Sequence, residues 1–314
     1  VIACWRVNTL AMRFTTVFAS LAMIHAFLEG HKPVVAPQSV LRRASILRGG
    51  NVVAQQALVA TPPEGFEGAV AAGVKKANMP AAKIFKLGVL SGCHIGFGAF
   101  LMLTVGGACP ALASSNPGVH KIILGAFGLP FGLMMTLLSG AELFTGNTAL
   151  VTMAVNEGKA TTTQLLKSWV ASYAGNFVGS LALAFLVFTG GTLVSGGASV
   201  PVAVAKSSLP FGKAFVRGIL CNWLVCMAVY LASFAKDVAG KMVAIWFCIS
   251  AFVALGLEHS VANMFIIPLG IFSGASVTWK AFLLKNLLPV TLGNIVGGAI
   301  CVGVAFCAVY GKEA

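Results

Sequence analysis

GAELFTGN at 140–147 and GLEHSVAN at 256–263 carry a glycine, a glutamate and an asparagine at the same relative places. Each octapeptide interrupts a long apolar stretch near its middle. Backbone that leaves a helix inside a bilayer must line protein or a water-filled path, because lipid cannot satisfy its N–H and C=O groups. The two octapeptides therefore predict two helix breaks, each beside a pathway through a membrane.

The likeness between the octapeptides extends along the chain as a repeat. The two glutamates are 116 residues apart, and a Gly-Asn-x-x-Gly pattern at 175–179 returns 118 residues later at 293–297. Two patterns that recur in the same order at nearly the same offset indicate an internal repeat. If each repeat holds an odd number of spans, its two copies cross the membrane in opposite senses.

The composition is that of a membrane protein. Hydrophobic residues make up 58 % of the 314 residues and charged residues only 9 %, which excludes an ordinary soluble domain. Six apolar stretches are each long enough for the ~20 residues that a helix needs to cross the hydrocarbon. They lie at about 84–106, 119–156, 165–190, 214–234, 240–272 and 281–310.

These stretches predict an all-α membrane protein with six transmembrane helices. The helices form two inverted three-helix repeats, at about 84–190 and 214–310, and helices 2 and 5 are the broken ones. The two repeats belong to one channel domain, which we place at 63–314. Residues 63–82 could form a short amphipathic helix on the membrane before the first span.

The net charge of +13 does not indicate a nucleic-acid partner, because the basic residues gather before residue 60 and at the ends of spans. That distribution is typical of membrane anchoring, and it favours a cytoplasmic or stromal side for both termini. The eight cysteines include no CxxC pair, so neither a metal site nor a cofactor is predicted.

Residues 1–62 resemble a targeting presequence, disordered or cleaved. MRFTTVFASLAMIHAF at 12–27 has the basic start and apolar core of a secretory signal, and the segment after it is basic and acid-poor like an organelle transit peptide. Together they predict a plastid envelope protein, with the plasma membrane as the alternative. The competing interpretation is a disordered tail preceded by translated sequence upstream of Met12.

Glu142 and Glu258, with Asn147 and Asn263, are predicted to support the two helix breaks. We expect the glutamates to accept hydrogen bonds from backbone amides that the breaks set free, and the asparagines to serve the same loops.

The second break differs from the first by a histidine, His259, where the first has Leu143. The repeat explains the glutamate but not this histidine. An ionisable group inside a bilayer is costly and usually faces a conduit, and histidine changes charge near neutral pH. His259 is therefore the main candidate for function. His94 is the second, and Gly92, Gly96 and Gly98 around it indicate a helix-packing seam.

Four segments resemble the signature segments of the formate-nitrite transporter family: GAELFTGN, CNWLVCMAVY (221–230), GLEHSVANMFIIPLG (256–270) and LLPVTLGNIVGG (287–298). The resemblance runs from about residue 63 to the C-terminus. Within the family the chain looks most like the plastid branch of algae, whose members are assigned to nitrite or bicarbonate. The resemblance implies an aquaporin-like protomer, a homopentamer with one pore per protomer, and passage of formate, nitrite or bicarbonate.

The family pattern also implies residue roles. The residues on the anion pathway would be His259, Thr145, Asn222 and Lys206. The apolar constriction would be formed by Leu133, Leu143, Phe144 and Phe252. In these roles the histidine is central, the threonine faces it from the other break, and the lysine attracts anions to a vestibule. A bulky aromatic often stands near Leu129 in the family, so a leucine there leaves the width of the constriction open.

We expect His259 to donate a hydrogen bond or a proton to an anion that has lost its hydration. The alternative is a neutral small-solute, aquaporin-like channel, but the breaks lack paired NPA triplets and an arginine filter. An enzyme is not expected, and no catalytic residue is assigned, because adjacent helical residues such as Glu258 and His259 point about 100° apart. HExxH and GxSxG motifs are also absent there. A purely structural membrane protein would leave both breaks unexplained.

Overall fold

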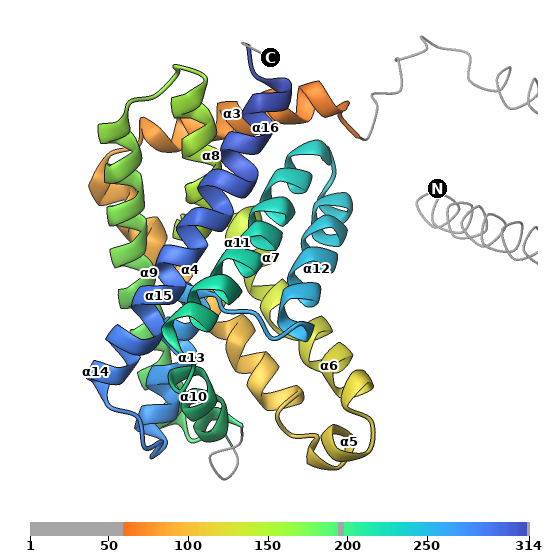
Figure 1. Cartoon of the computed structure of the whole chain (residues 1–314), viewed down its shortest axis with the longest axis vertical. Helices are drawn as coiled ribbons and strands as arrows, with labels where there is room; N and C mark the ends of the chain where they lie inside the picture. Colours follow the sequence, from red (N-terminus) through yellow and green to blue (C-terminus); the bar gives the residue numbers. More distant parts are fainter. Residues whose placement is uncertain (1–58, 194–197, 313–314) are drawn as a thin grey trace, which may run out of the picture. The chain divides into compact units, whose positions relative to one another are not determined.

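The computed structural model describes residues 59–193 and 198–312, which are almost entirely helical (Figure 1). Nearly all of the predicted presequence, residues 1–58, lies outside the described residues. The described chain opens with an isolated bridge from Val59 to Ala235 and enters its first helix at Pro62, close to the predicted boundary.

The helices follow one another as α3 Pro62–Ala77, α4 Ala81–Val105, α5 Pro110–Ser115, α6 Pro117–Ala126, α7 Leu129–Ser139, α8 Phe144–Asn156, α9 Thr162–Gly190, α10 Ser199–Ser207, α11 Phe211–Phe234, α12 Val238–Ala254, α13 Ser260–Phe272, α14 Trp279–Ala281, α15 Leu288–Ile295 and α16 Ala305–Tyr310. Two π-helical segments, η2 Phe282–Leu287 and η3 Val296–Val304, make the last five elements one continuous rod.

Local sequence explains where several helices begin. At α3 the Glu64 carboxylate accepts from the Thr61 backbone N–H at 2.8 Å, as in a capping box. This backbone bond and one from the Thr61 hydroxyl hold the pKa of Glu64 below its usual value. Thr161 and Gln164 form the same box at α9, where the threonine N–H donates to the glutamine side chain at 2.9 Å.

Within the described ranges, five helical segments are long and apolar enough to cross a membrane: Ala81–Val105, Pro117–Ser139, Thr162–Gly190, Phe211–Phe234 and Trp279–Tyr310. The stretch 240–272 is broken, as predicted, into α12 and α13, whose 17 and 13 residues are each too short to cross a membrane alone. Large apolar side chains such as Val170 and Leu186 point outward, with 67 % and 63 % exposure, as expected of surfaces that meet lipid or another protomer.

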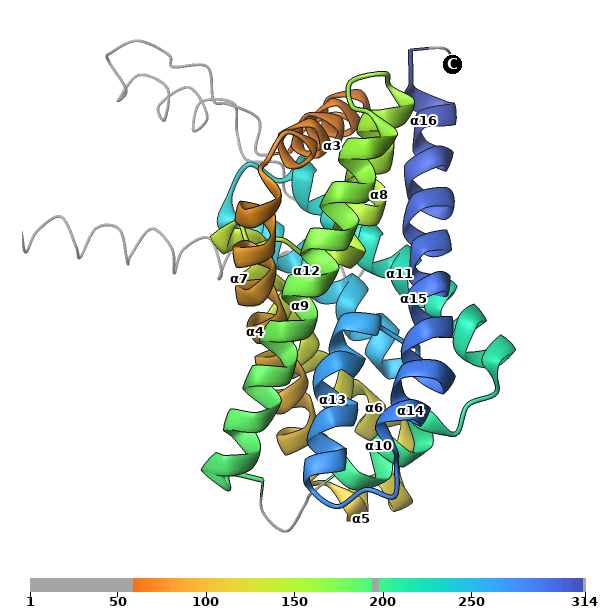
Figure 2. The same ribbon diagram turned by 90° about the vertical axis from the view of Figure 1, so that its left-hand side faces the viewer.

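The two halves of the bundle run in opposite directions. Helices α3, α8 and α16 lie at one end, and α5, α10 and α14 lie at the other, in both Figure 1 and Figure 2. α4 and α9 run from the α3 end to the α10 end, whereas α11 and α15 run the other way.

Glycines allow the long helices to pack closely. A Cβ added to Gly179 in α9 would collide with the Val89 carbonyl oxygen of α4, and one added to Gly297 in η3 would collide with the Ile219 carbonyl oxygen of α11. Backbone is thus in direct contact with backbone at both crossings, as in small-residue interfaces of membrane helices.

The glycines around His94 form the expected packing seam. Gly92 is pressed against α9, Gly96 lies between α9 and α13, and Gly98 touches Gly132 in α7. His94 itself is half-buried, and its Nδ1 has no hydrogen-bond partner within the described ranges.

Candidate functional site

Both octapeptides leave the helix deep inside the protein. α7 ends at Ser139, Gly140 after it has a φ of +73°, the left-handed conformation that glycine tolerates, and α8 begins at Phe144. α12 ends at Ala254, Gly256 has φ of +70°, and α13 begins at Ser260. The glutamate of each break is about 2 % exposed.

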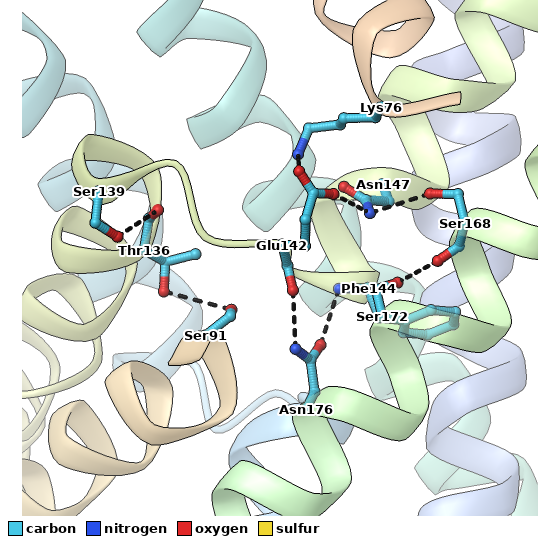
Figure 3. A network of polar contacts seen from close by, with 10 residues as sticks. All are labelled: Lys76, Ser91, Thr136, Ser139, Glu142, Phe144, Asn147, Ser168, Ser172 and Asn176. Atoms are coloured by element: carbon cyan, nitrogen blue, oxygen red, sulfur yellow. Dashed lines mark hydrogen bonds and ion pairs between the residues drawn. The ribbon is translucent and has the colours of Figure 1, made fainter. Parts of the chain in front are cut away.

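One asparagine side chain holds the first break to the neighbouring helices. Asn176 of α9 accepts a hydrogen bond from the Phe144 backbone N–H at 2.9 Å (Figure 3). Its amide group donates to the carbonyl oxygens of Glu142 at 2.9 Å and Gly88 at 2.8 Å. An asparagine amide can serve both a freed N–H and a freed C=O, which a carboxylate cannot.

The Glu142 side chain has different partners from those expected. Its carboxylate pairs with Lys76 Nζ at 2.8 Å and accepts from Asn147 Nδ2, also at 2.8 Å (Figure 3). We expected freed backbone amides in this role, and that detail was wrong. A carboxylate only accepts, and when buried it needs a cation or several strong donors, which a lysine and an asparagine supply.

The second break repeats the asparagine brace. Asn294 accepts from the Ser260 backbone N–H at 2.8 Å and donates to the carbonyl oxygens of Glu258 at 3.0 Å and Gly218 at 2.9 Å. These are the same three kinds of bond that Asn176 makes. Asn176 and Asn294 were visible in the repeat, but only the contacts reveal what they hold.

The second carboxylate also has a lysine and an asparagine. Glu258 pairs with Lys206 Nζ at 2.9 Å and accepts from Asn263 Nδ2 at 2.7 Å. The predicted vestibule lysine is therefore engaged with a carboxylate. Its counterpart Lys76 was not predicted. The signal was available, since each lysine precedes the first long helix of its half.

The predicted pair His259 and Thr145 is in contact. His259 Nε2 lies 2.9 Å from Thr145 Oγ1, and both side chains are buried. His259 is also the N-cap of α13, where its Nδ1 accepts from the Ala262 backbone N–H at 3.1 Å. Because Nδ1 must keep its lone pair for that bond, the proton of the neutral ring lies on Nε2, which donates to the threonine.

A cavity of about 310 Å³ leads to His259 from the α10 end. Lys206, Arg217 and Glu258 supply its charged groups, and Leu129 and Phe252 lie on its apolar wall. Asn263 Oδ1, whose residue also lines the cavity, has no hydrogen-bond partner among the residues described.

An apolar gap continues beyond His259. Its volume of about 10 Å³ is lined by His259, Leu129, Leu133, Leu143 and Phe252 together with three further apolar side chains. A space of that size is at the lower limit for holding a single water molecule. Three of the four predicted constriction residues therefore gather beside the histidine, and Leu129 joins them.

Phe144 and Asn222 lie outside this gap. The Phe144 ring packs edge-on against Tyr173, with centroids 4.9 Å apart. Asn222 is fully buried, and its amide donates to the Thr145 carbonyl at 3.2 Å and the Asn294 carbonyl at 2.6 Å. Asn222 thus links the first turn of α8 to α15, the helix whose Asn294 holds the second break.

The arrangement offers a hydrogen-bond donor where a charged cavity narrows to an apolar gap. No cluster of metal-ligating side chains occurs in residues 59–193 and 198–312. A small solute entering from the α10 end would lose water at the gap and meet His259 and Thr145 at that point.

Comparisons with known proteins identify the family of this chain. A family model described as Formate/nitrite transporter matches residues 63–308. The chain is 43 % identical over 256 residues to a "Probable formate transporter" of Methanothermobacter thermautotrophicus, covering 76 % of this chain and 92 % of that protein. It is 37 % identical over 223 residues to "Nitrite transporter NirC" of Escherichia coli (strain K12), covering 69 % and 80 %.

A solved structure titled "Pentameric formate channel with formate bound" has a similar fold. It superimposes with a TM-score of 0.65 at 30 % identity, covering 74 % of this chain and 98 % of that one.

Proposed function

We propose, on the premise that this chain belongs to the formate/nitrite transporter family, that it carries small monovalent anions such as formate, nitrite and bicarbonate across a membrane. The chain is an integral membrane protein, and its relatives are transporters and channels rather than enzymes. Formate and nitrite come from the names of the relatives, and bicarbonate comes from the resemblance of the motifs alone.

The observation that carries the proposal is the hydrogen bond of 2.9 Å between His259 Nε2 and Thr145 Oγ1 at the narrow end of the cavity. An anion that arrives there exchanges part of its hydration for the Nε2–H donor. This bond to a charged acceptor is stronger than one between neutral groups, so it lowers the barrier of the apolar gap.

Of the two forms of donation, the geometry favours a hydrogen bond over a proton handed on by a resting imidazolium. In the present structure Nδ1 accepts a hydrogen bond from the Ala262 N–H at 3.1 Å. An imidazolium would carry a second proton on Nδ1, and two N–H donors would then face each other. The helix N-terminus also disfavours a positive charge at its cap. Protonation of the anion therefore draws its proton from water, and His259 polarises the anion.

The proposed protomer has six membrane crossings in two inverted repeats, with the broken helices as the second and fifth. This is supported by the opposed directions of α4 and α11 and by the matching braces of Asn176 and Asn294. A homopentamer is supported by the pentameric formate channel of similar fold and by the apolar outer face.

A plastid envelope location rests on the sequence of residues 1–62. The test is to fuse those residues to a fluorescent protein in an alga with plastids. Plastid import is expected. Fluorescence at the plasma membrane would support the alternative location.

The transport proposal is tested by anion flux into proteoliposomes. Wild-type protein is expected to carry formate and nitrite. His259→Phe and Thr145→Val are expected to lower the flux about ten-fold or more, because the loss of a hydrogen bond to a charged group raises the barrier by about 1.5–3 kcal/mol. Thr152→Val is the matched control, because Thr152 is buried in α8 and, among the described residues, its hydroxyl bonds only to the Thr148 carbonyl at 2.5 Å.

Glycerol flux in the same vesicles distinguishes the neutral-solute alternative. Glycerol passage without formate passage would replace the proposal by that alternative. Wild-type formate flux that His259→Phe leaves unchanged would remove the role of the histidine only.

A further inference from the structure

The charges along the cavity do not all cancel. Lys206 and Glu258 form an ion pair of 2.9 Å, so together they add little net charge. Arg217 also lines the cavity, and its guanidinium has no hydrogen bond or ion pair within the described part of the chain. His259 adds no charge while its Nδ1 accepts from Ala262. The uncompensated charge of the cavity is therefore that of Arg217.

Arg217 has a defined counterpart in the other half of the protein. Its backbone carbonyl accepts from the Glu258 N–H at 3.4 Å, and the Leu87 carbonyl accepts from the Glu142 N–H at 3.2 Å. The same backbone position thus carries an arginine near the α10 end and a leucine near the α3 end. The repeat leaves this difference unexplained, as it does that between His259 and Leu143.

We propose that Arg217 is an anion-recruiting and selecting residue at the cavity entrance, and that it makes the two ends of the pathway unequal. This inference rests on the proposed function. The ligands are planar oxyanions with two oxygens on one centre, a class to which formate, nitrite and bicarbonate belong. A guanidinium offers two parallel N–H donors that match such an anion, whereas a lysine or a halide cannot form that bidentate pair.

The location of Arg217 suits capture and release. Its side chain is exposed, and it lies in the second turn of α11. An anion that enters from solvent would therefore meet Arg217 first and the buried His259 afterwards. An exposed charge acts on the rate of anion entry through its field, and salt screens that field over about 8–10 Å at ordinary ionic strength. The effect should therefore appear in the anion concentration that half-saturates flux, and it should fall with added salt.

The test compares Arg217→Gln, Arg217→Lys and Lys213→Gln in proteoliposomes at low salt. Lys213 lies on the same helix and is exposed, but it does not line the cavity. Arg217→Gln is expected to raise the half-saturating formate concentration about five-fold, with maximal flux within a factor of two. Lys213→Gln is expected to match wild type. Added potassium chloride at about 0.5 M, whose anion cannot form the bidentate pair, should bring wild type and Arg217→Gln together.

Arg217→Lys separates charge from geometry. It is expected to keep the half-saturating formate concentration low, because the positive charge remains. It is also expected to lose part of the preference for formate and nitrite over chloride, because lysine lacks the two parallel N–H donors of the guanidinium. In planar bilayers, the Arg217→Gln effect is expected only when formate is added on the α10 side, identified by cleavage of a C-terminal tag on the opposite side.

Three outcomes would overturn the inference. The first is an equal shift in Arg217→Gln and Lys213→Gln. The second is a loss of maximal flux in Arg217→Gln without a change in half-saturation, which indicates a structural role. The third is an effect that persists at high salt. If wild type itself carries no anion, the proposed function fails, and that result is distinct from all three.

Discussion

His259 uses both nitrogens of its ring for contacts inside the protein. Its Nδ1 caps α13 and its Nε2 faces Thr145, so each nitrogen has its own task. The adjacent Glu258 points away from this bond, toward Lys206 and Asn263. The two neighbours in the sequence thus have separate contacts: the glutamate braces the break, and the histidine is the group that we propose to meet the solute.

Removing Lys206 should destabilise the second break. Lys206→Met leaves the Glu258 carboxylate, which is 2 % exposed, without its cation, and a broken buried pair costs up to about 3–5 kcal/mol. We expect a lower melting temperature in detergent. Lys206→Met with Glu258→Gln should recover much of the loss, because the neutral amide can still accept from Asn263.

Lys213→Met is the control for this pair, since that lysine is exposed on α11. Equal melting temperatures for Lys206→Met and Lys213→Met would mean that the ion pair contributes nothing to stability.

At the scale of elements, the breaks hold their place because long helices pass close behind them. α9 presents Asn176 to the first break, and α15 presents Asn294 to the second. Each asparagine has glycines beside it that bring its helix against α4 or α11. A larger residue at those glycines would move the asparagine away from the backbone groups that it satisfies.

Gly179→Ala is expected to destabilise the contact of α9 with α4. The new methyl group would collide with the Val89 carbonyl oxygen, and overpacking of this kind costs about 1–3 kcal/mol. Thermal unfolding in detergent should show a clear fall in melting temperature.

Gly190→Ala in the same helix is its matched control, because the nearest atom to an added Cβ there is 4.0 Å away. That variant should be neutral or slightly stabilising through helix propensity. If Gly179→Ala and Gly190→Ala had the same melting temperature, the close crossing of α9 and α4 would not be needed for stability.

At the scale of the whole channel unit, the two halves meet directly at equivalent positions. Tyr173 of α9 and Thr291 of α15 are 118 residues apart, the same offset as Asn176 and Asn294, and their hydroxyl oxygens lie 3.0 Å apart. Tyr173 also packs edge-on against Phe144, the first residue after the first break. This contact therefore couples the first turn of α8, which carries Thr145, to the opposite half.

A double-mutant cycle of Tyr173→Phe and Thr291→Val should measure that coupling. We expect an interaction free energy of about 0.6 kcal/mol, the average for hydrogen bonds between membrane helices. Unfolding by a denaturing detergent provides the measurement. Strictly additive effects of the two substitutions would show that the hydroxyls do not interact.

The sequence by itself determined the membrane class, the helical stretches and the two breaks, and it set His259 apart as the candidate residue. These follow from local properties: the length of an apolar run, the spacing of two motifs, and the cost of an ionisable group among apolar neighbours. His259 stood out because the repeat predicted a leucine there.

Only the tertiary structure decided which groups satisfy one another. Glu142 and Glu258 each form an ion pair with a lysine, and Asn176 and Asn294 accept from the backbone N–H groups at the breaks. Phe144 packs against Tyr173 and does not line the gap. Hydrogen-bond partners and cavity walls depend on which helices cross and at what distance, and those crossings join residues that are far apart along the chain. For the same reason, the uncompensated charge of Arg217 becomes visible only when its neighbours are in place.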